Sequence, residues 1–176
     1  ILSEQTEDRL FDAVRVINDI CEKHDCYETL IAEKKAEQDE LLLIRSEHYN
    51  FIVNDICDSF DYAVPVSCIP AFISDLKALA ASYNTGNNIV AHIADGNVHG
   101  DMWYVDGKTP EYADEYKRKM YDLVFKYNGT ITGEHGIGKI RRKDLKLQLS
   151  ETELSLMRGI KNVFDPKGLL NPGTVL

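Results

Sequence analysis

The stretch NIVAHIADGNVHGDMWYV at residues 88–105 decides the fold, because it contains two extended segments on either side of a tight turn. Residues 88–92 and 98–105 have the composition of strands, and Asp95-Gly96-Asn97 between them is typical of a turn. Asp106-Gly107 follows as a second turn signal. The sequence therefore predicts two neighbouring strands here.

Helical periodicity surrounds these strands. It predicts helices over residues 6–23, 34–57, 70–83 and 111–127, and a last helix that begins at Ser150 with a capping box and ends at Asp165-Pro166. Further short strands are expected over 28–32, 62–66 and 130–133. Mixed elements with turns that join strands directly predict an α+β fold, with a mostly antiparallel sheet and helices packed on one face. The buried stripe of the last helix is expected to be Leu154, Met157, Ile160 and Phe164.

Composition limits the classes of function. The 176 residues suit one domain, and a net charge of −9 argues against a nucleic-acid partner. The apolar runs are far shorter than the roughly 20 residues that a membrane-spanning helix needs. Four cysteines form no CxxC pair, and no signal peptide is visible, which predicts a reducing, cytoplasmic setting. Because the chain begins at Ile1 and a helical pattern follows at once, we expect a domain from a longer protein.

Two histidines seven residues apart flank the first turn, in HIADGNVH at residues 92–99. On one straight strand, His92 and His99 would lie on opposite faces, roughly 23 Å apart at about 3.3 Å per residue. The turn at Asp95-Gly96-Asn97 can bring them back together. The spacing therefore suits a pair of metal ligands only because of this turn.

A second candidate segment is GEHGIG at residues 133–138. Glu134 and His135 are adjacent, so that one can bind a metal while the other faces a substrate. The glycines, Gly136 among them, permit close approach of another backbone or of a flat ligand. Two histidines and a glutamate form a ligand set of catalytic zinc, and a neutral-range histidine such as His135 suits a general base.

Spacing alone leaves simpler readings open. Isolated histidines are more often structural than metal-binding, and a glycine run is more often a turn. The basic run Lys139, Arg141, Arg142 and Lys143 reads as a solvated face, with capture of an anion as the alternative.

The order and spacing of three motifs carry a family resemblance. HIADGNVH, then GTITGEHGIG, then LMRGIKNVFDPKGLLNPG resembles the C-terminal domain of FAD-linked oxidases, in the branch of D-lactate, glycolate and D-2-hydroxyglutarate dehydrogenases. The resemblance implies that residues 1–176 form a ferredoxin-like cap domain that binds substrate and metal. It also implies an FAD bound mainly by an N-terminal domain that these residues do not include.

The resemblance also assigns roles to single residues. His92, His99 and Glu134 would bind a divalent metal, with zinc favoured over manganese or iron, and His135 would be the base. Asn171 in LNPG and Gly136 would lie near the flavin. Arg45 would bind the substrate carboxylate, for which a planar guanidinium is suited.

Some positions depart from the family pattern. Asp101 replaces the usual asparagine beside the substrate, where it would disfavour an anionic substrate or join the metal ligands. Ser59 stands where a lysine is usual, and Ala94 where a glycine is usual.

The leading hypothesis is the catalytic cap of a flavin enzyme that oxidises a small D-2-hydroxy acid to the 2-oxo acid, inactive without its flavin domain. Its partners would be the hydroxy acid, the flavin domain and a redox protein, through which it could associate with a membrane surface. Two alternatives are a metal-dependent hydrolase that acts alone, and a non-catalytic subunit that docks onto a separate flavoprotein.

Overall fold

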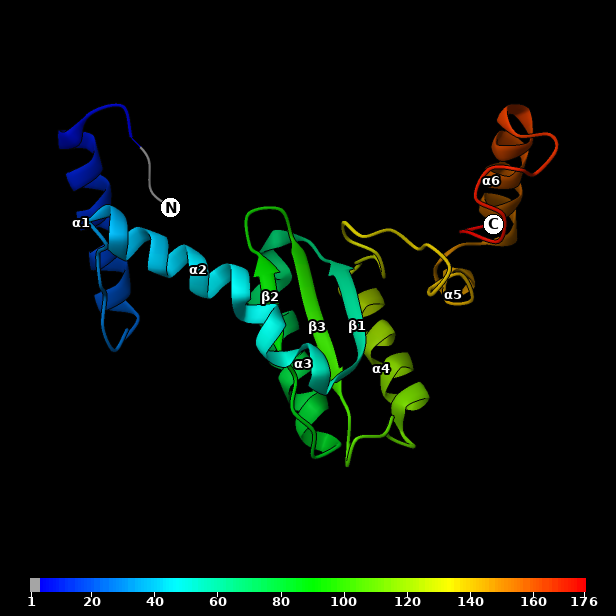
Figure 1. Cartoon of the computed structure of the whole chain (residues 1–176), viewed down its shortest axis with the longest axis horizontal. Helices are drawn as coiled ribbons and strands as arrows, with labels where there is room; N and C mark the ends of the chain where they lie inside the picture. Colours follow the sequence, from blue (N-terminus) through cyan, green and yellow to red (C-terminus); the bar gives the residue numbers. More distant parts are fainter. Residues whose placement is uncertain (1–3) are drawn as a thin grey trace. The chain divides into compact units, whose positions relative to one another are not determined.

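The computed structural model describes residues 4–176, which divide into two compact units between Phe51 and Ile52 (Figure 1). Each unit is described by itself. Within the described residues, we find no helix that combines the length and the apolar character needed to cross a membrane.

The described residues of the first unit form α1 (Glu7–Lys23) and all but the last residue of α2 (Lys35–Ile52). Thr6 caps α1 by accepting a hydrogen bond from the backbone N–H of Arg9, and the helix agrees with the one predicted over residues 6–23. The predicted strand over 28–32 is wrong: this segment is irregular, and Leu30 is 80% exposed. A lone extended segment has no ladder partner, so its backbone does not gain strand hydrogen bonds.

The second unit is built on a three-stranded antiparallel sheet, the one sheet among residues 4–176. Its strands are β1 (Ile56–Ala63), β2 (Ile89–His92) and β3 (Asn97–Trp103), in the order β1-β3-β2. The helix predicted over 34–57 was too long, because a 3₁₀ turn, η1 (Val53–Asp55), and the start of β1 occupy its last residues. The strand predicted over 62–66 in fact ends at Ala63, two residues before Pro65, which cannot donate to a ladder.

Two helices cover one face of this sheet. After the 3₁₀ turn η2 (Val66–Cys68), α3 (Ile69–Ser82) and later α4 (Ala113–Lys126) lie on the same side of the strands (Figure 1). The hydrophobic core lies between the sheet and these two helices. This arrangement confirms the predicted α+β fold with helices on one face of the sheet. Its fully buried side chains include Phe60, Tyr62, Phe72, Leu76, Val98, Tyr116, Met120, Tyr121 and Val124. The opposite face of the sheet carries the polar alternate residues of β1 and β3.

The C-terminal segment contains α5 (Leu145–Gln148) and α6 (Glu151–Phe164). Ser150 and Glu153 form the predicted capping box. The predicted strand over 130–133 is reduced to one bridge between Ala63 and Thr130. The predicted buried stripe of α6 is only partly correct, since Leu154 is buried and Met157 packs on the core, but Ile160 and Phe164 are 62% and 79% exposed. Only the N-terminal half of α6 reaches the core of this unit.

Candidate functional site

The β2–β3 hairpin brings His92 and His99 together. His92 pairs with Asn97 in the ladder and His99 pairs with Val90, so the two histidines are diagonal neighbours on one face. Their ring centroids are 5.7 Å apart. The turn between β2 and β3 therefore brings the two histidines onto one face, which a shared metal ion would require.

Gly96 makes this turn possible. Its φ of +92° lies in the region that favours glycine, and a Cβ there would lie 2.2 Å from the backbone oxygen of Val64. Its own carbonyl accepts a hydrogen bond of 3.0 Å from the N–H of Val64. The Asp95 carboxylate also accepts from the N–H of Asn97 at 3.1 Å, an Asx-type bond that supports the reversal.

Glu134 approaches both histidines from the irregular loop that follows Thr132. Its Oε1 lies 3.1 Å from His99 Nε2 and 3.5 Å from His92 Nε2. About half of the Glu134 side chain is exposed, so the cluster opens to solvent. Three groups that are distant in sequence therefore converge on one point above the open face of the sheet.

Asp61 on β1 holds this loop in place. It is the ladder partner of His99, and its Oδ2 accepts the consecutive backbone N–H groups of Gly133, Glu134 and His135 at 2.9, 2.9 and 2.8 Å. Burial raises the pKa of Asp61, but these N–H donors and the Asn97 amide outweigh it and leave that pKa below the ordinary value. Asp61 is thus held as a carboxylate.

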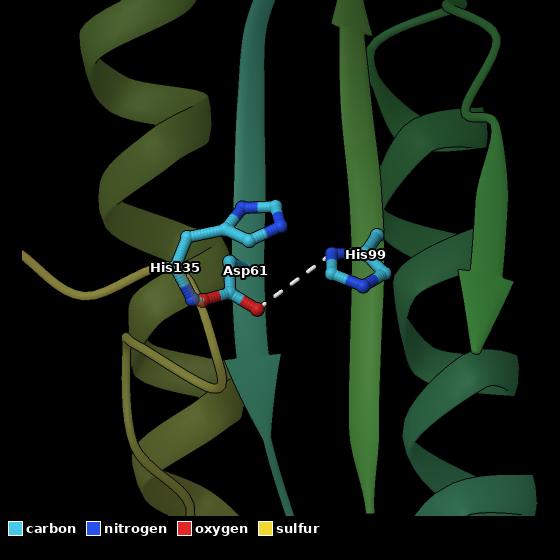
Figure 2. A group of neighbouring side chains, drawn as sticks. All are labelled: Asp61, His99 and His135. Carbon is cyan, nitrogen blue, oxygen red and sulfur yellow. Dashed lines mark hydrogen bonds and ion pairs between the residues drawn. The ribbon is translucent and has the colours of Figure 1, made fainter. Parts of the chain in front are cut away.

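His135 stands beside the cluster on the same loop. Its ring stacks on that of His99 at a centroid distance of 4.9 Å, and its Nε2 lies 3.6 Å from Glu134 Oε1. Its side chain is 65% exposed. Figure 2 shows the ring above the Asp61 carboxylate and turned toward His99. The imidazole is therefore accessible to a small molecule bound at the open face.

Two sets of metal-donor atoms meet here, each with all its atoms within 4.8 Å of one another. One set is His92, His99 and Glu134, and the other is Asp61, His99 and His135. Glu134 accepts no hydrogen bond from a backbone group of the described chain, whereas both Asp61 oxygens accept strong ones. The first set therefore fits a divalent ion better, since its carboxylate is free to bind one.

Asp101 lies on β3 two residues beyond His99, on the same open face, and is buried. Its two oxygens accept hydrogen bonds from Ser59 Oγ at 2.6 Å and from Asn88 Nδ2 at 2.8 Å. Ser59 is also its ladder partner, which repeats the Asp61–His99 arrangement one step along the sheet. Its role toward a substrate stays a prediction.

The other predicted residues lie outside this cluster. Arg45 is in α2, in the first unit, and its predicted contact with a substrate carboxylate stays a prediction. Gly136 is exposed with a φ of +76° and open space at its Cβ position, and Asn171 is exposed with a φ of +46°. Their predicted approach to a flavin also stays a prediction.

The basic run divides into two parts. Arg141 is 12% exposed and forms two hydrogen bonds to the Asp58 carboxylate and one to the Ser59 carbonyl. Three other residues of the run instead line an open pocket of about 440 Å³, whose lining includes Lys139, Arg142, Lys143, Lys146, Arg158, Gly173, Val175 and Leu176. Arg141 therefore has a structural role, and capture of an anion by Lys139, Arg142 and Lys143 stays a prediction.

Asp61 and Asn97 are the residues that sequence reasoning missed. Asn97 Nδ2 donates to Asp61 Oδ1 at 2.7 Å and to the Tyr62 carbonyl at 2.8 Å. A Cβ at Gly133 would lie 2.1 Å from that same nitrogen, so the loop can come this close only with glycine there. The signal was the alternation of polar Ser59 and Asp61 with apolar Phe60 and Tyr62, which marks one open face of a strand.

Comparison with known proteins identifies the family of this chain. The family model for FAD linked oxidases, C-terminal domain, matches residues 2–175. The D-lactate dehydrogenase of Archaeoglobus fulgidus is 31% identical over 166 residues, which cover 94% of this chain and 37% of the relative. The D-2-hydroxyglutarate dehydrogenase of Stutzerimonas stutzeri is 35% identical over 65% of this chain and 26% of its own length. Glycolate oxidase subunit GlcD of Escherichia coli is 28% identical over 89% of this chain and 32% of its own length.

The chain thus spans about a third of the length of these relatives. The match extends over both units, from the first helix to the C-terminal tail. It includes the histidine hairpin and the loop that carries Glu134 and His135. The chain therefore belongs to the FAD-linked oxidase family and corresponds to its C-terminal domain.

Proposed function

We propose that this chain is the substrate- and metal-binding part of a flavin-dependent dehydrogenase that oxidises a small D-2-hydroxy acid to the 2-oxo acid. The observation that carries the proposal is the convergence of His92, His99 and Glu134, with His135 accessible beside them. The substrate class is supported by the names of the relatives, D-lactate and D-2-hydroxyglutarate dehydrogenase.

His92, His99 and Glu134 would hold a divalent metal, zinc first, with manganese or iron as alternatives. Two imidazoles and a carboxylate form a known catalytic zinc set. Such an ion acts as a Lewis acid toward an oxygen of the substrate. The open side of Glu134 leaves room for the hydroxyl and carboxylate of a 2-hydroxy acid.

His135 would take the hydroxyl proton. Oxidation of a 2-hydroxy acid removes a hydride from the α-carbon and a proton from the hydroxyl group. FAD accepts the hydride when it is bound. The His135 ring is exposed and lies beside the proposed metal ligands, where a bound hydroxyl group could reach it. The His135 ring also stacks on the His99 ring, which supports this placement of the base beside the metal ligands.

The remaining roles complete the proposal. Arg45 would bind the substrate carboxylate, and Asp101 would lie beside the substrate. Gly136 and Asn171 would approach the flavin. A buried carboxylate at Asp101, close to the open face, favours a substrate without a second negative charge at that end.

The first test is the metal content of the purified chain, measured by mass spectrometry beside His92→Ala. We expect near-stoichiometric zinc, manganese or iron in the unmodified chain and loss of metal in the variant. Absence of metal from the unmodified chain after incubation with these ions would contradict the proposed centre.

The second test separates binding from catalysis in the complete enzyme, where the flavin domain is present. We expect His135→Ala to lower turnover while metal content stays normal. Loss of the metal in this variant would show that His135 is a ligand and not the base. Hydrolysis of generic esters or phosphoesters by the chain alone would favour a hydrolase.

A further inference from the structure

Asp61 connects every part of the candidate site without belonging to the favoured donor set. It lies in the middle of β1, directly across the ladder from His99, and its side chain is 11% exposed. The loop that it contacts begins 72 residues later in the sequence. A charged group in this position needs compensation from its neighbours.

The negative charge of the Asp61 carboxylate is compensated mostly by backbone N–H groups of the loop that carries Glu134 and His135. One oxygen accepts three consecutive N–H groups, those of residues 133–135. Successive backbone N–H groups that converge on one anion form a nest, and the anion fixes the conformation of such a segment. Neither helix nor strand holds residues 133–138, so Asp61 supplies the hydrogen bonds that regular structure supplies elsewhere.

The other oxygen faces the strand side of the site. It accepts from Asn97 Nδ2 at 2.7 Å and lies 3.6 Å from His99 Nδ1 (Figure 2). A carboxylate on this side favours the His99 tautomer with the proton on Nδ1. That tautomer leaves Nε2, which lies 3.1 Å from Glu134, with a free lone pair for a metal.

We propose that Asp61 is the positioning residue of this centre, and that it sets metal affinity by fixing the Glu134–His135 loop and orienting His99. This rests on the proposed function in one respect, namely that the centre binds a metal. In this arrangement Asp61 is not itself a ligand, because its Oδ2 is taken up by three N–H groups, and its Oδ1 accepts from Asn97 and faces Nδ1 of His99, whereas Glu134 faces Nε2.

The test measures zinc affinity of the whole chain by competition with a chromophoric chelator, after the chain has been stripped of metal. We compare the unmodified chain with Asp61→Asn, His92→Ala and the control Asp75→Asn. Asp75 also accepts two side-chain hydrogen bonds, from Lys126 and Tyr127, but it lies on α3, which covers the other face of the sheet. Circular dichroism checks that each variant is folded.

We expect Asp61→Asn to bind zinc roughly 10- to 100-fold more weakly, as loss of an outer carboxylate does elsewhere. Asp75→Asn should keep the original affinity. Unchanged affinity in folded Asp61→Asn would overturn the positioning role. Complete loss, equal to that of His92→Ala, would also overturn it, because Asp61 would then be a ligand. If the unmodified chain binds no zinc, the proposed metal centre is contradicted, and this outcome is distinguishable from a normal centre with unchanged affinity in Asp61→Asn.

A second measurement covers the case in which Asp61→Asn does not fold. Amide hydrogen exchange of the unmodified chain should show protection at Glu134 and His135, since both N–H groups donate to the Asp61 carboxylate. The Gly133 N–H is left out of this comparison, because it also donates to the Asp61 backbone carbonyl at 3.1 Å. The neighbouring Gly136 amide, for which the described chain offers no acceptor, is the internal comparison. Equal exchange at the amides of Glu134, His135 and Gly136 would overturn the proposal.

Discussion

Gly96 and Gly133 let two backbone segments approach the sheet more closely than any side chain would allow. A Cβ at Gly96 would lie 2.2 Å from the Val64 oxygen, and one at Gly133 would lie 2.1 Å from Asn97 Nδ2. The first glycine shapes the turn between the two histidines, and the second seats the loop of Glu134. The candidate site therefore depends on residues that contribute no functional group.

We predict that Gly96→Ala destabilises the chain more than Gly107→Ala does. Both glycines have positive φ, +92° and +70°, but Gly107 has open space where the Cβ would stand. Left-handed backbone alone costs about 1–2 kcal/mol for alanine. The clash at Gly96 adds about 2 kcal/mol by analogy with overpacked sites. Urea unfolding measures both, and equal losses would contradict the close contact with Val64.

The sequence suggested the histidine and glutamate positions, whereas the alternation around Asp61 indicated only an open strand face and not its place opposite His99. Turn residues and glycines lie next to His92, His99 and Glu134 in the sequence. Because such residues let the chain reverse direction and pack closely, they suggest that the three side chains converge. Asp61 becomes part of the site only through the register that sets it opposite His99. Register depends on the pairing of distant strands, which local sequence does not encode.

At the level of elements, helices were easier to predict than strands. The predicted helices over 6–23, 70–83 and 111–127 agree with α1, α3 and α4 within two residues at each end. Strand β1 was largely missed because Asp58, Ser59 and Asp61 are poor strand formers. Their polar side chains suit the open face of the sheet, so tertiary context decides this element.

The capping box of α6 gives a prediction for that helix. Ser150 Oγ accepts from the N–H of Glu153 at 3.3 Å, and Glu153 accepts from the N–H of Ser150 at 2.7 Å. Ser150→Ala should lower the free energy of unfolding by about 1 kcal/mol. Thr152→Ala, an exposed position in the same turn, is the control and should not lower it. Thermal unfolding followed by circular dichroism compares the two.

The end of α6 gives a prediction that depends on pH. The Lys161 side chain and the N–H groups of Leu170 and Leu169 lower the pKa of Asp165 to about 2. A lowered pKa stabilises the folded tail above the unfolded pKa of about 3.9, and this contribution is lost as pH falls toward 2. Amide exchange at Leu169 and Leu170 should therefore accelerate, relative to the pH trend of free peptide, between about pH 4 and pH 2.

Asp165→Asn is the control for this effect. It removes the ionisable group but keeps one oxygen that can accept from the N–H of Leu169 or Leu170. Exchange at both amides should be faster than in the unmodified chain at neutral pH and should lose the extra acceleration in acid. A steep acid response in this variant would assign the effect to another group.

At the scale of the second unit, the side chain of Arg141 links the C-terminal segment to the sheet. Arg141 bonds to the Asp58 carboxylate and the Ser59 carbonyl on β1, and its guanidinium lies 4.6 Å from the Phe60 ring centre. Tyr121 on α4 also donates to Asp144 of the same segment at 2.9 Å. The chain from Gly133 to Arg141 is therefore attached to β1 at both ends, at residues 133–135 by Asp61 and at Arg141 by Asp58 and Ser59.

We expect Arg141→Ala to destabilise the chain by about 2–3 kcal/mol, less than for a fully buried ion pair, because it leaves Asp58 without its cation but 25% exposed to water. Arg142→Ala is the matched control, since that arginine is exposed and lines only the basic pocket. It should change stability by less than about 0.5 kcal/mol. Arg141→Lys should recover only part of the loss, because an ammonium group cannot form the paired bonds to Asp58. Urea unfolding of the three variants would contradict the link if Arg141→Ala and Arg142→Ala had the same free energy of unfolding.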